Sequence, residues 1–311
     1  MKAVLPALAR PLIEAGLPAE IEPHWFTNQA EAAAMIADAD IAWVDMMRPE
    51  WTGEAAAAGA QLKWLSTIYA GIDAFDIGLL RERGTTLTNG VGINAIAVAE
   101  YAVMGILAAA KRFDQVVRIA DRREWPADAP GKVELFETRA LIIGYGTIGR
   151  MTGDRLAAFG VDVTGVTRSG RDGTLAPDQW RNRIGEFDWI ILAAPSTGDT
   201  HALIGAAELA AMKPGAWLIN VARGDMVDQP ALIEALEKRR IAGAFLDVVD
   251  PEPLPADHSL WAAPNVIHSM HLSGRSQTKM FMRAAALFLE NARAFVEGRP
   301  MRNVVDLDAG Y

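Results

Sequence analysis

Residues 140–149 read ALIIGYGTIG, a short apolar run that leads directly into three glycines spaced as G-x-G-x-x-G. The apolar run predicts a buried strand, and the spacing of apolar residues after the glycines predicts a helix. Gly144 permits a tight turn, Gly146 lets a ligand approach the backbone, and Gly149 lets the helix pack closely on the strand. The free amides and the dipole at the start of that helix attract anions. The stretch therefore predicts a dinucleotide site, formed by Gly144, Gly146, Thr147, Ile148 and Gly149.

Apolar runs on either side of this stretch predict the class of fold. Before it, short apolar runs alternate with Ala-rich helical stretches, and after it the runs are near-continuous, as in strands buried on both faces. We predict strands near Val4 and at 41–44, 62–67, 86–88, 161–166, 189–193, 217–221, 244–248 and 266–267. Together with a length of 311 residues, this indicates an α/β protein with two doubly wound domains, Rossmann-like or flavodoxin-like.

Composition limits the partners of the chain. A net charge of −9 gives no overall attraction for nucleic acid or for an anionic membrane. The absence of cysteine excludes disulfides and thiolate metal ligands. The apolar run at the N-terminus is interrupted by Pro6, Arg10 and Pro11, so we predict neither a signal peptide nor a membrane span. We expect a cytoplasmic protein with no bound metal.

The segment between the two predicted domains contains a long helix and an arm. Apolar residues recur every three or four positions over 96–110, which predicts a helix that carries the chain from one domain to the other. Residues 112–132 mix charged residues with prolines and a glycine, which indicates an extended connecting arm. Trp125 in this arm is either a subunit contact or local packing.

Three titratable residues follow three successive predicted strands. Arg223 lies in NVARGDMVD, Glu252 in DVVDPEPLP and His271 in SMHLSG. Because the carboxyl ends of parallel strands meet at one edge of a sheet, these three side chains are expected to converge. Each residue alone has a simpler explanation, as an exposed arginine, a loop carboxylate beside prolines or a hydrogen-bonded structural histidine. Together with a dinucleotide turn upstream, the three instead indicate one functional cleft.

At this point the chain resembles the D-isomer-specific 2-hydroxyacid dehydrogenase family, which includes glyoxylate and hydroxypyruvate reductases. The resemblance covers nearly the whole length. Its motifs are YAGID (69–73), NAIAVAEYA (94–102), GYGTIG (144–149), APSTGDT (194–200), MKPGAWLINVARGDMVD (212–228), DVVDPEPLP (247–255), HLSG (271–274) and EGRPMRNVVD (297–306).

The resemblance implies an organisation and a reaction. A discontinuous substrate domain (1–100 and 285–311), a central dinucleotide-binding domain (101–284), a cleft between them, and a homodimer formed through the cofactor domains are expected. The implied reaction is reduction of a 2-keto acid to a D-2-hydroxy acid, with Arg223, Glu252 and His271 as the catalytic residues. His271 would donate the proton, Glu252 would favour its charged form, and Arg223 would hold the carboxylate and polarise the carbonyl.

The resemblance also implies further binding residues. Asp247 is similar to the residue that binds the nicotinamide carboxamide, and the amides of Ala70 and Gly71 would receive the substrate carboxylate. Met46, Met47, Arg48 and Tyr69 either wall a substrate pocket or are core residues under a loop. The remaining cofactor-binding residues are expected to be Ala194, Pro195, Thr200, Val221, Ala222, Ser273 and Gly274.

Two histidines compete for the catalytic position. The family usually has proline before the catalytic histidine, whereas this chain has Met270, and His268 stands three residues before His271. We assign the role to His271 because Leu-Ser-Gly follows it, and we interpret His268 as a structural histidine. A different class remains open, a nucleotide-sensing scaffold that resembles transcriptional corepressors with this fold.

The end of the strand at 161–166 bears on the choice of cofactor. An NAD site places an acidic residue about 20 positions beyond the glycines, where it binds the ribose 2′-hydroxyl. Here Thr167, Arg168, Ser169 and Arg171 occupy that region. Two arginines can pair with a 2′-phosphate, which an acid would repel. We therefore expect NADP(H) to be preferred over NAD(H), unless the segment is an exposed basic loop without a ligand.

Overall fold

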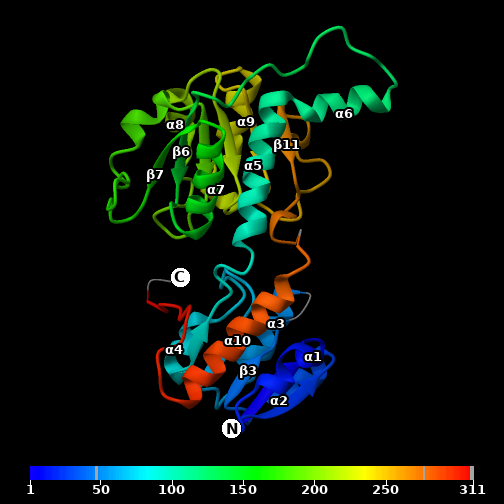
Figure 1. Ribbon diagram of the computed structural model, residues 1–311, viewed down its shortest axis with the longest axis vertical. Coiled ribbons are helices and arrows are strands. Elements are labelled where there is room, and N and C mark those ends of the chain that lie inside the picture. The colour runs from blue at the N-terminus through cyan, green and yellow to red at the C-terminus, as the bar shows by residue number, and fades with distance from the viewer. Residues whose placement is uncertain (46–47, 276, 309–311) are drawn as a thin grey trace. The chain divides into compact units, whose positions relative to one another are not determined.

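The computed structural model describes residues 1–45, 48–275 and 277–308, and these form two compact α/β units. Unit 1 comprises residues 1–94 and the C-terminal segment from Gln277, and unit 2 comprises residues 95–276. Both sheets are wholly parallel (Figure 1). The boundaries expected from the sequence, at 100 and 285, each fall inside a helix, whereas in the structure each of those helices belongs wholly to one unit.

Unit 1 has a five-stranded sheet in the order β2-β1-β3-β4-β5. Its strands are β1 Lys2–Pro6, β2 Glu22–Phe26, β3 Ile41–Trp43, β4 Trp64–Ser66 and β5 Thr86–Thr88, and its α-helices are α1 Arg10–Ile13, α2 Gln29–Ile36, α3 Pro49–Ala57, α4 Ile77–Arg83 and α10 Met280–Val296. The expected strands are present here, but the sequence analysis missed β2. This edge strand reads EPHWF, is mostly half-exposed and contains a proline, so it lacks a buried-strand pattern.

Unit 2 has a six-stranded sheet in the order β11-β10-β9-β8-β6-β7. Its strands are β6 Arg139–Ile143, β7 Asp162–Val166, β8 Trp189–Leu192, β9 Trp217–Asn220, β10 Gly243–Leu246 and β11 Val266–His268, and its α-helices are α5 Ala95–Lys111, α6 Phe113–Asp121, α7 Thr147–Ala158, α8 Ala206–Ala211 and α9 Gln229–Glu237. In both units the strand order reverses beside the first strand, as in doubly wound folds. In unit 2 this switch point lies between β6 and β8.

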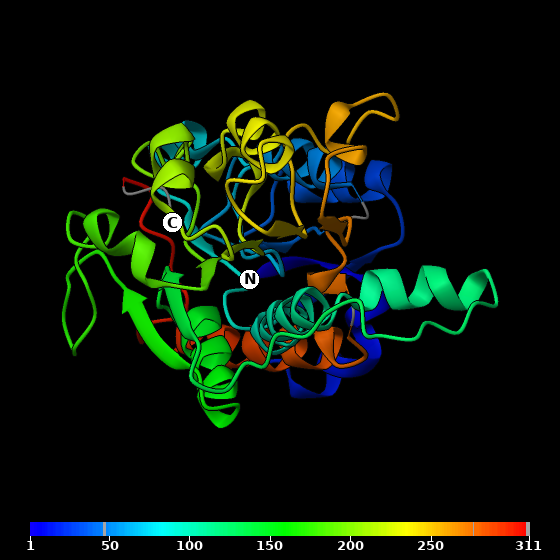
Figure 2. The same cartoon turned by 90° about the horizontal axis from the view of Figure 1, so that it is seen from above.

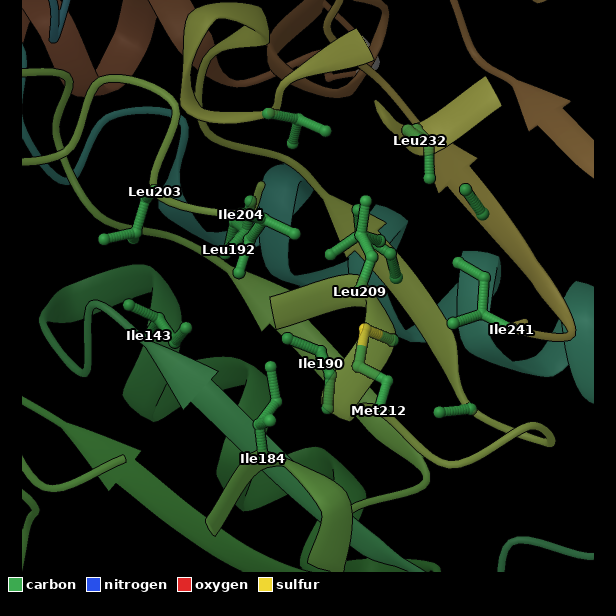
Figure 3. Packing of buried hydrophobic residues seen from close by; sticks show 14 of the residues in the cluster. Ile143, Ile184, Ile190, Leu192, Leu203, Ile204, Leu209, Met212, Leu232 and Ile241 are labelled. Carbon is green, nitrogen blue, oxygen red and sulfur yellow. The ribbon is translucent and has the colours of Figure 1, made fainter. Parts of the chain in front are cut away.

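Successive residues of the unit 2 strands alternate between two cores. Ile143, Ile190 and Leu192 face a core that α8 and α9 cover (Figure 3). Ile142, Ile191 and Ile219 face a second core with α5 and α7. Burial on both faces explains why these strands read as continuous apolar runs.

Unit 1 is completed by the C-terminal helix. Phe288 of α10 stacks on Trp43 of β3 and Trp64 of β4, with ring centroids 5.2 and 5.0 Å apart, and all three side chains are buried. The two ends of the chain therefore share one hydrophobic core.

The expectation of an extended arm over residues 112–132 is wrong for its first part, which forms helix α6. This helix and the segment after it extend away from the sheet of unit 2 (Figure 1). Figure 2 shows the protruding helix from above. Phe113 lies one helical turn before Val116 and Val117, a helical spacing that the polar residues around them obscured in the sequence. Trp125 is 98% exposed. Among the described residues, every helix is too short or too polar to cross a membrane.

Candidate functional site

The glycine turn lies after β6, at the switch point of the unit 2 sheet. Gly144 has φ of +97°, and a Cβ at this position would lie 2.3 Å from the amide nitrogen of Ala194, so only glycine fits. A Cβ on Gly149 would lie 2.3 Å from the carbonyl oxygen of Gly144. In contrast, no atom lies within 4 Å of the corresponding position on Gly146. Helix α7 begins directly after Gly146 without a side-chain cap, which leaves its N-terminal end suited to an anion.

Ala194 and Pro195 begin the loop that faces this turn from the end of β8. The hydroxyl of Thr200 donates to the carbonyl of Pro195 over 2.9 Å and accepts from the amide of Thr197 over 2.8 Å, so the loop is closed by its own hydrogen bonds. Val221 and Ala222, which follow β9, are buried. The structure therefore brings the residues expected at the cofactor to adjacent strand ends of one sheet.

Asp247 lies directly after β10, and only one of its two carboxylate oxygens has hydrogen-bond partners. Its Oδ1 accepts from the hydroxyl of Ser269 over 2.7 Å and from the amides of Leu272 and Ser273 over 3.1 and 3.3 Å. Its Oδ2 is buried and has no hydrogen-bond partner within the described part of the chain. A buried acceptor without a donor is costly. It suits a ligand that carries an amide N–H, such as the carboxamide of a nicotinamide, so the residues fit the cofactor that the sequence implies.

Arg223 follows β9 in a turn that Asn220 holds. The side-chain amide of Asn220 donates to the carbonyl of Arg223 over 2.8 Å, and its oxygen accepts from the amide of Ala222 over 3.0 Å. The guanidinium is half-buried and reaches the carbonyl of Ala222 at 2.8 Å. The backbone around the arginine is therefore fixed from the strand itself.

His271 and Glu252 form a direct pair. Nδ1 of His271 lies 2.6 Å from Oε2 of Glu252, and Oε1 of Glu252 accepts from the amide of Val249 over 3.2 Å. Burial raises the pKa of Glu252, but the hydrogen bond from His271 and the charges of His271 and Arg223 outweigh burial and bring it below its ordinary value. The carboxyl is thus held as an anion, within the electrostatic influence of the arginine.

The backbone at His271 is strained in a way that the sequence did not predict. Met270 and His271 both have positive φ, 54° and 55°, and the amide of His271 donates to the carbonyl of Asp247 over 2.5 Å. Two consecutive side-chain-bearing residues in the left-handed region are costly and tend to occur where function requires them. This conformation turns the chain after β11 so that the imidazole meets Glu252.

His268 lies elsewhere, at the end of β11. Its Nε2 is 3.3 Å from the carbonyl of Leu260, and its ring packs on Trp261 at a centroid distance of 4.7 Å. Burial lowers the pKa of His268 more than the hydrogen bond to Leu260 raises it. These contacts of a half-buried histidine favour the interpretation of His268 as a structural residue, which stays a prediction.

Residues 167–175, after β7, fold into a short closed loop. The amide of Thr167 donates to the carbonyl of Leu175, and the hydroxyls of Thr167 and Thr174 are 2.7 Å apart. Arg168, Ser169 and Arg171 are exposed on this loop. The side chain of Thr167 thus belongs to the loop's internal hydrogen bonds, and the two arginines face solvent.

In unit 1, the loop at 68–71 leaves β4. The carbonyl of Tyr69 accepts from the amide of Gly90 over 2.8 Å, and that of Ala70 accepts from the side chain of Asn89 over 3.0 Å. The amides of Ala70 and Gly71 make no hydrogen bond to any described residue. Met46 and Met47, which we expected near the substrate, lie outside the described residues. The sequence analysis missed Asp45, which binds this loop, because a single acid at a strand end carries no recognisable spacing.

Comparison with known proteins places the chain among similar enzymes. The family described as "D-isomer specific 2-hydroxyacid dehydrogenase, NAD binding domain" matches residues 103–273, which include Arg223, Glu252 and His271. Glyoxylate/hydroxypyruvate reductase B of Pectobacterium atrosepticum is 34% identical over 257 residues, 79% of each chain. Glyoxylate reductase of Thermofilum pendens is 32% identical over 286 residues, 88% of this chain and 83% of that protein.

A solved structure is similar over the whole chain. The D-isomer specific 2-hydroxyacid dehydrogenase family protein of Aeromonas salmonicida superposes with a TM-score of 0.86 at 30% identity and covers 99% of both chains.

Within the described residues, no group of three histidine, aspartate or glutamate side chains could hold a metal ion.

Proposed function

Because the chain belongs to the D-isomer specific 2-hydroxyacid dehydrogenase family, and is thus an oxidoreductase with a nicotinamide cofactor, we propose that it reduces a 2-keto acid to a D-2-hydroxy acid. The favoured substrates are of the glyoxylate and hydroxypyruvate type, which relatives are named for. The observation that carries the proposal is the 2.6 Å pair of His271 and Glu252, with Arg223 close enough to lower the pKa of that carboxyl.

The chemistry divides between the residues of this pair and the arginine. A nicotinamide cofactor held by the glycine turn and Asp247 would supply the hydride. His271, oriented through Nδ1 by the Glu252 carboxylate, donates the proton from Nε2 to the oxygen that becomes negative. Arg223 pairs with the substrate through its fork of donors and stabilises the same developing charge. In unit 1, the amides of Ala70 and Gly71 bind the substrate carboxylate.

A panel of 2-keto acids tests the proposal. Cofactor oxidation is followed with glyoxylate, hydroxypyruvate, pyruvate, phenylpyruvate and branched 2-keto acids, and the substrates are ranked by kcat/KM. Turnover that yields the D-isomer supports the proposal. A chain that binds the cofactor but turns over none of these acids is instead a nucleotide-sensing scaffold with the same fold.

We further propose that NADP(H) is preferred over NAD(H). The support is the exposed pair Arg168 and Arg171 on the closed loop after β7, without an acid at the position that would bind a ribose 2′-hydroxyl. Arg168→Ala should lower the ratio of kcat/KM for NADPH to that for NADH by roughly 10-fold or more. Arg240→Ala, an exposed arginine after α9, serves as the control and should leave the ratio unchanged. A wild type that prefers NADH would contradict the proposal.

The apolar side chains on α5 and α6 support a homodimer formed through unit 2. Met104, Leu107 and Phe113 line one hollow of about 410 Å³, and Phe113 is 57% exposed. Exposed apolar surface of this kind marks an association site more often than a free surface. We propose that a second copy of the chain covers it.

A further inference from the structure

A carboxylate lies under the loop that follows β4. Asp45 stands two residues beyond β3, and three donors converge on its side chain. Its Oδ2 accepts from the indole Nε1 of Trp43 over 2.5 Å and from the amide of Ile68 over 2.6 Å, and its Oδ1 accepts from the hydroxyl of Thr67 over 2.5 Å. Two of these donors belong to Thr67 and Ile68, the residues that lead into Tyr69, Ala70 and Gly71.

The same loop is held from its other side by the segment after β5. The side chain of Asn89 donates to Ala70, and the amide of Gly90 donates to Tyr69. A Cβ on Gly90 would lie 1.9 Å from the carbonyl oxygen of Ile68, so glycine alone permits this approach. Asp45 accepts hydrogen bonds from Thr67 and Ile68, whereas Asn89 and Gly90 donate hydrogen bonds to the carbonyls of Ala70 and Tyr69. Of the backbone amides of residues 67–71, those of Thr67, Ile68 and Tyr69 donate to described groups, and those of Ala70 and Gly71 do not.

We propose that Asp45 is a positioning residue, which holds the loop at 67–71 in the conformation that presents the Ala70 and Gly71 amides to the substrate carboxylate. The inference rests on the proposed function, because it assigns these amides to a 2-keto acid. Asp45 touches neither substrate nor cofactor in this role. It acts on the substrate affinity through the fraction of molecules whose loop is competent to bind.

The hydrogen bonds explain which properties of Asp45 matter. Both donors to Oδ2 are N–H groups that cannot reverse, so this atom has to be an acceptor. The donor to Oδ1 is the hydroxyl of Thr67, which can reverse and accept instead. An asparagine can therefore satisfy all three partners, with its oxygen toward Trp43 and Ile68 and its amide toward Thr67. Burial raises the pKa of Asp45 to about 6 despite these donors, so the charge itself is unfavourable and the acceptor geometry is what the loop uses.

Asp45→Ala and Asp45→Asn test the inference together. Asp40→Ala is the matched control, because Asp40 lies just before the same strand and accepts from the amide of Lys2 over 2.9 Å and from Lys63 over 2.7 Å. We expect Asp45→Ala to raise the KM of the 2-keto acid about 10- to 100-fold, the range for loss of hydrogen bonds to a charged group. The KM of NADPH should change less than about 2-fold, since that site lies in unit 2. Asp45→Asn should stay near the wild type, and so should the control.

A second measurement, which needs no turnover, is the rate of backbone amide hydrogen exchange in peptides that span residues 64–72. Asp45→Ala should accelerate exchange there, and Asp45→Asn and Asp40→Ala should not. The inference is overturned if Asp45→Ala leaves either the keto-acid KM or this exchange unchanged, if it raises both KM values equally, or if Asp45→Asn is as damaging as Asp45→Ala. A wild type that reduces no keto acid contradicts the proposed function, while unchanged exchange in Asp45→Ala contradicts the role of Asp45.

Discussion

Asp45 also makes the stability of the protein depend on pH in a direction opposite to most carboxylates. Burial raises its pKa from 3.8 to about 6, more than its three hydrogen bonds lower it. Between these values the unfolded chain has lost the proton and the folded chain has kept it, so stability falls as pH rises and is level above the folded pKa. At about 1.4 kcal/mol per pKa unit, the loss is about 3 kcal/mol in total, of which about 2 kcal/mol falls between about pH 4.5 and about pH 8.

The comparison of wild type with Asp45→Asn isolates this effect, because every other group titrates alike in both proteins. Urea unfolding across that pH range should show the free energy of unfolding of Asp45→Asn rising relative to wild type by about 2 kcal/mol toward alkaline pH. Asp40→Asn should show almost no pH dependence relative to wild type across this range, because the hydrogen bond from Lys63 lowers the pKa of Asp40 below 3.8 in the folded protein, and its contribution therefore changes only at more acidic pH. A difference between wild type and Asp45→Asn that is constant across pH, or that reverses sign, would refute the reasoning.

Three further predictions concern the catalytic pair and the assembly. His271→Ala should lower kcat by roughly 100- to 10,000-fold while cofactor binding survives, and His268→Ala should be mild. The opposite ranking in steady-state assays would reassign the acid. Glu252→Gln should lower kcat for keto-acid reduction, because Nδ1 of His271 loses its carboxylate partner at 2.6 Å, and an unchanged kcat would contradict that role. Phe113→Asp should convert a dimer to a monomer in light scattering, whereas Phe159→Asp, also exposed, should not.

The unit 2 fold could be predicted from the sequence because its signals are local. Strands buried on both faces read as apolar runs, and the turn at 144–149 requires glycines for reasons of space that the structure displays at Gly144 and Gly149. The edge strand β2 and the helix α6 carry no such signal, since both are half-exposed and interrupted by polar residues. Whether an element is buried or exposed to solvent, more than how far apart its contacts lie in the sequence, decided whether it could be predicted.

Much of the candidate site could be predicted from residue types at strand ends, but its geometry could not. Order along the chain predicted that Arg223, Glu252 and His271 would follow adjacent strands. It could not predict the left-handed backbone at Met270 and His271, because residues other than glycine adopt positive φ uncommonly and two in succession leave no pattern in the sequence. Nor did it predict the unpartnered Oδ2 of Asp247. This oxygen has no partner because three donors that are distant in sequence all bind Oδ1. Such features arise from tertiary packing and have no counterpart in spacing.

The stacking of Phe288 between Trp43 and Trp64 has a consequence for the order in which the protein is made. A ribosome delivers residues 1–94 first, but this part lacks α10, so the face that carries both tryptophans remains uncovered. Unit 2 is one continuous segment and is complete before α10 is translated. The growing chain thus holds a finished cofactor-binding unit beside an unfinished one with an apolar face, which is the species that chaperones recognise. Translation of the last helix is the event that closes unit 1.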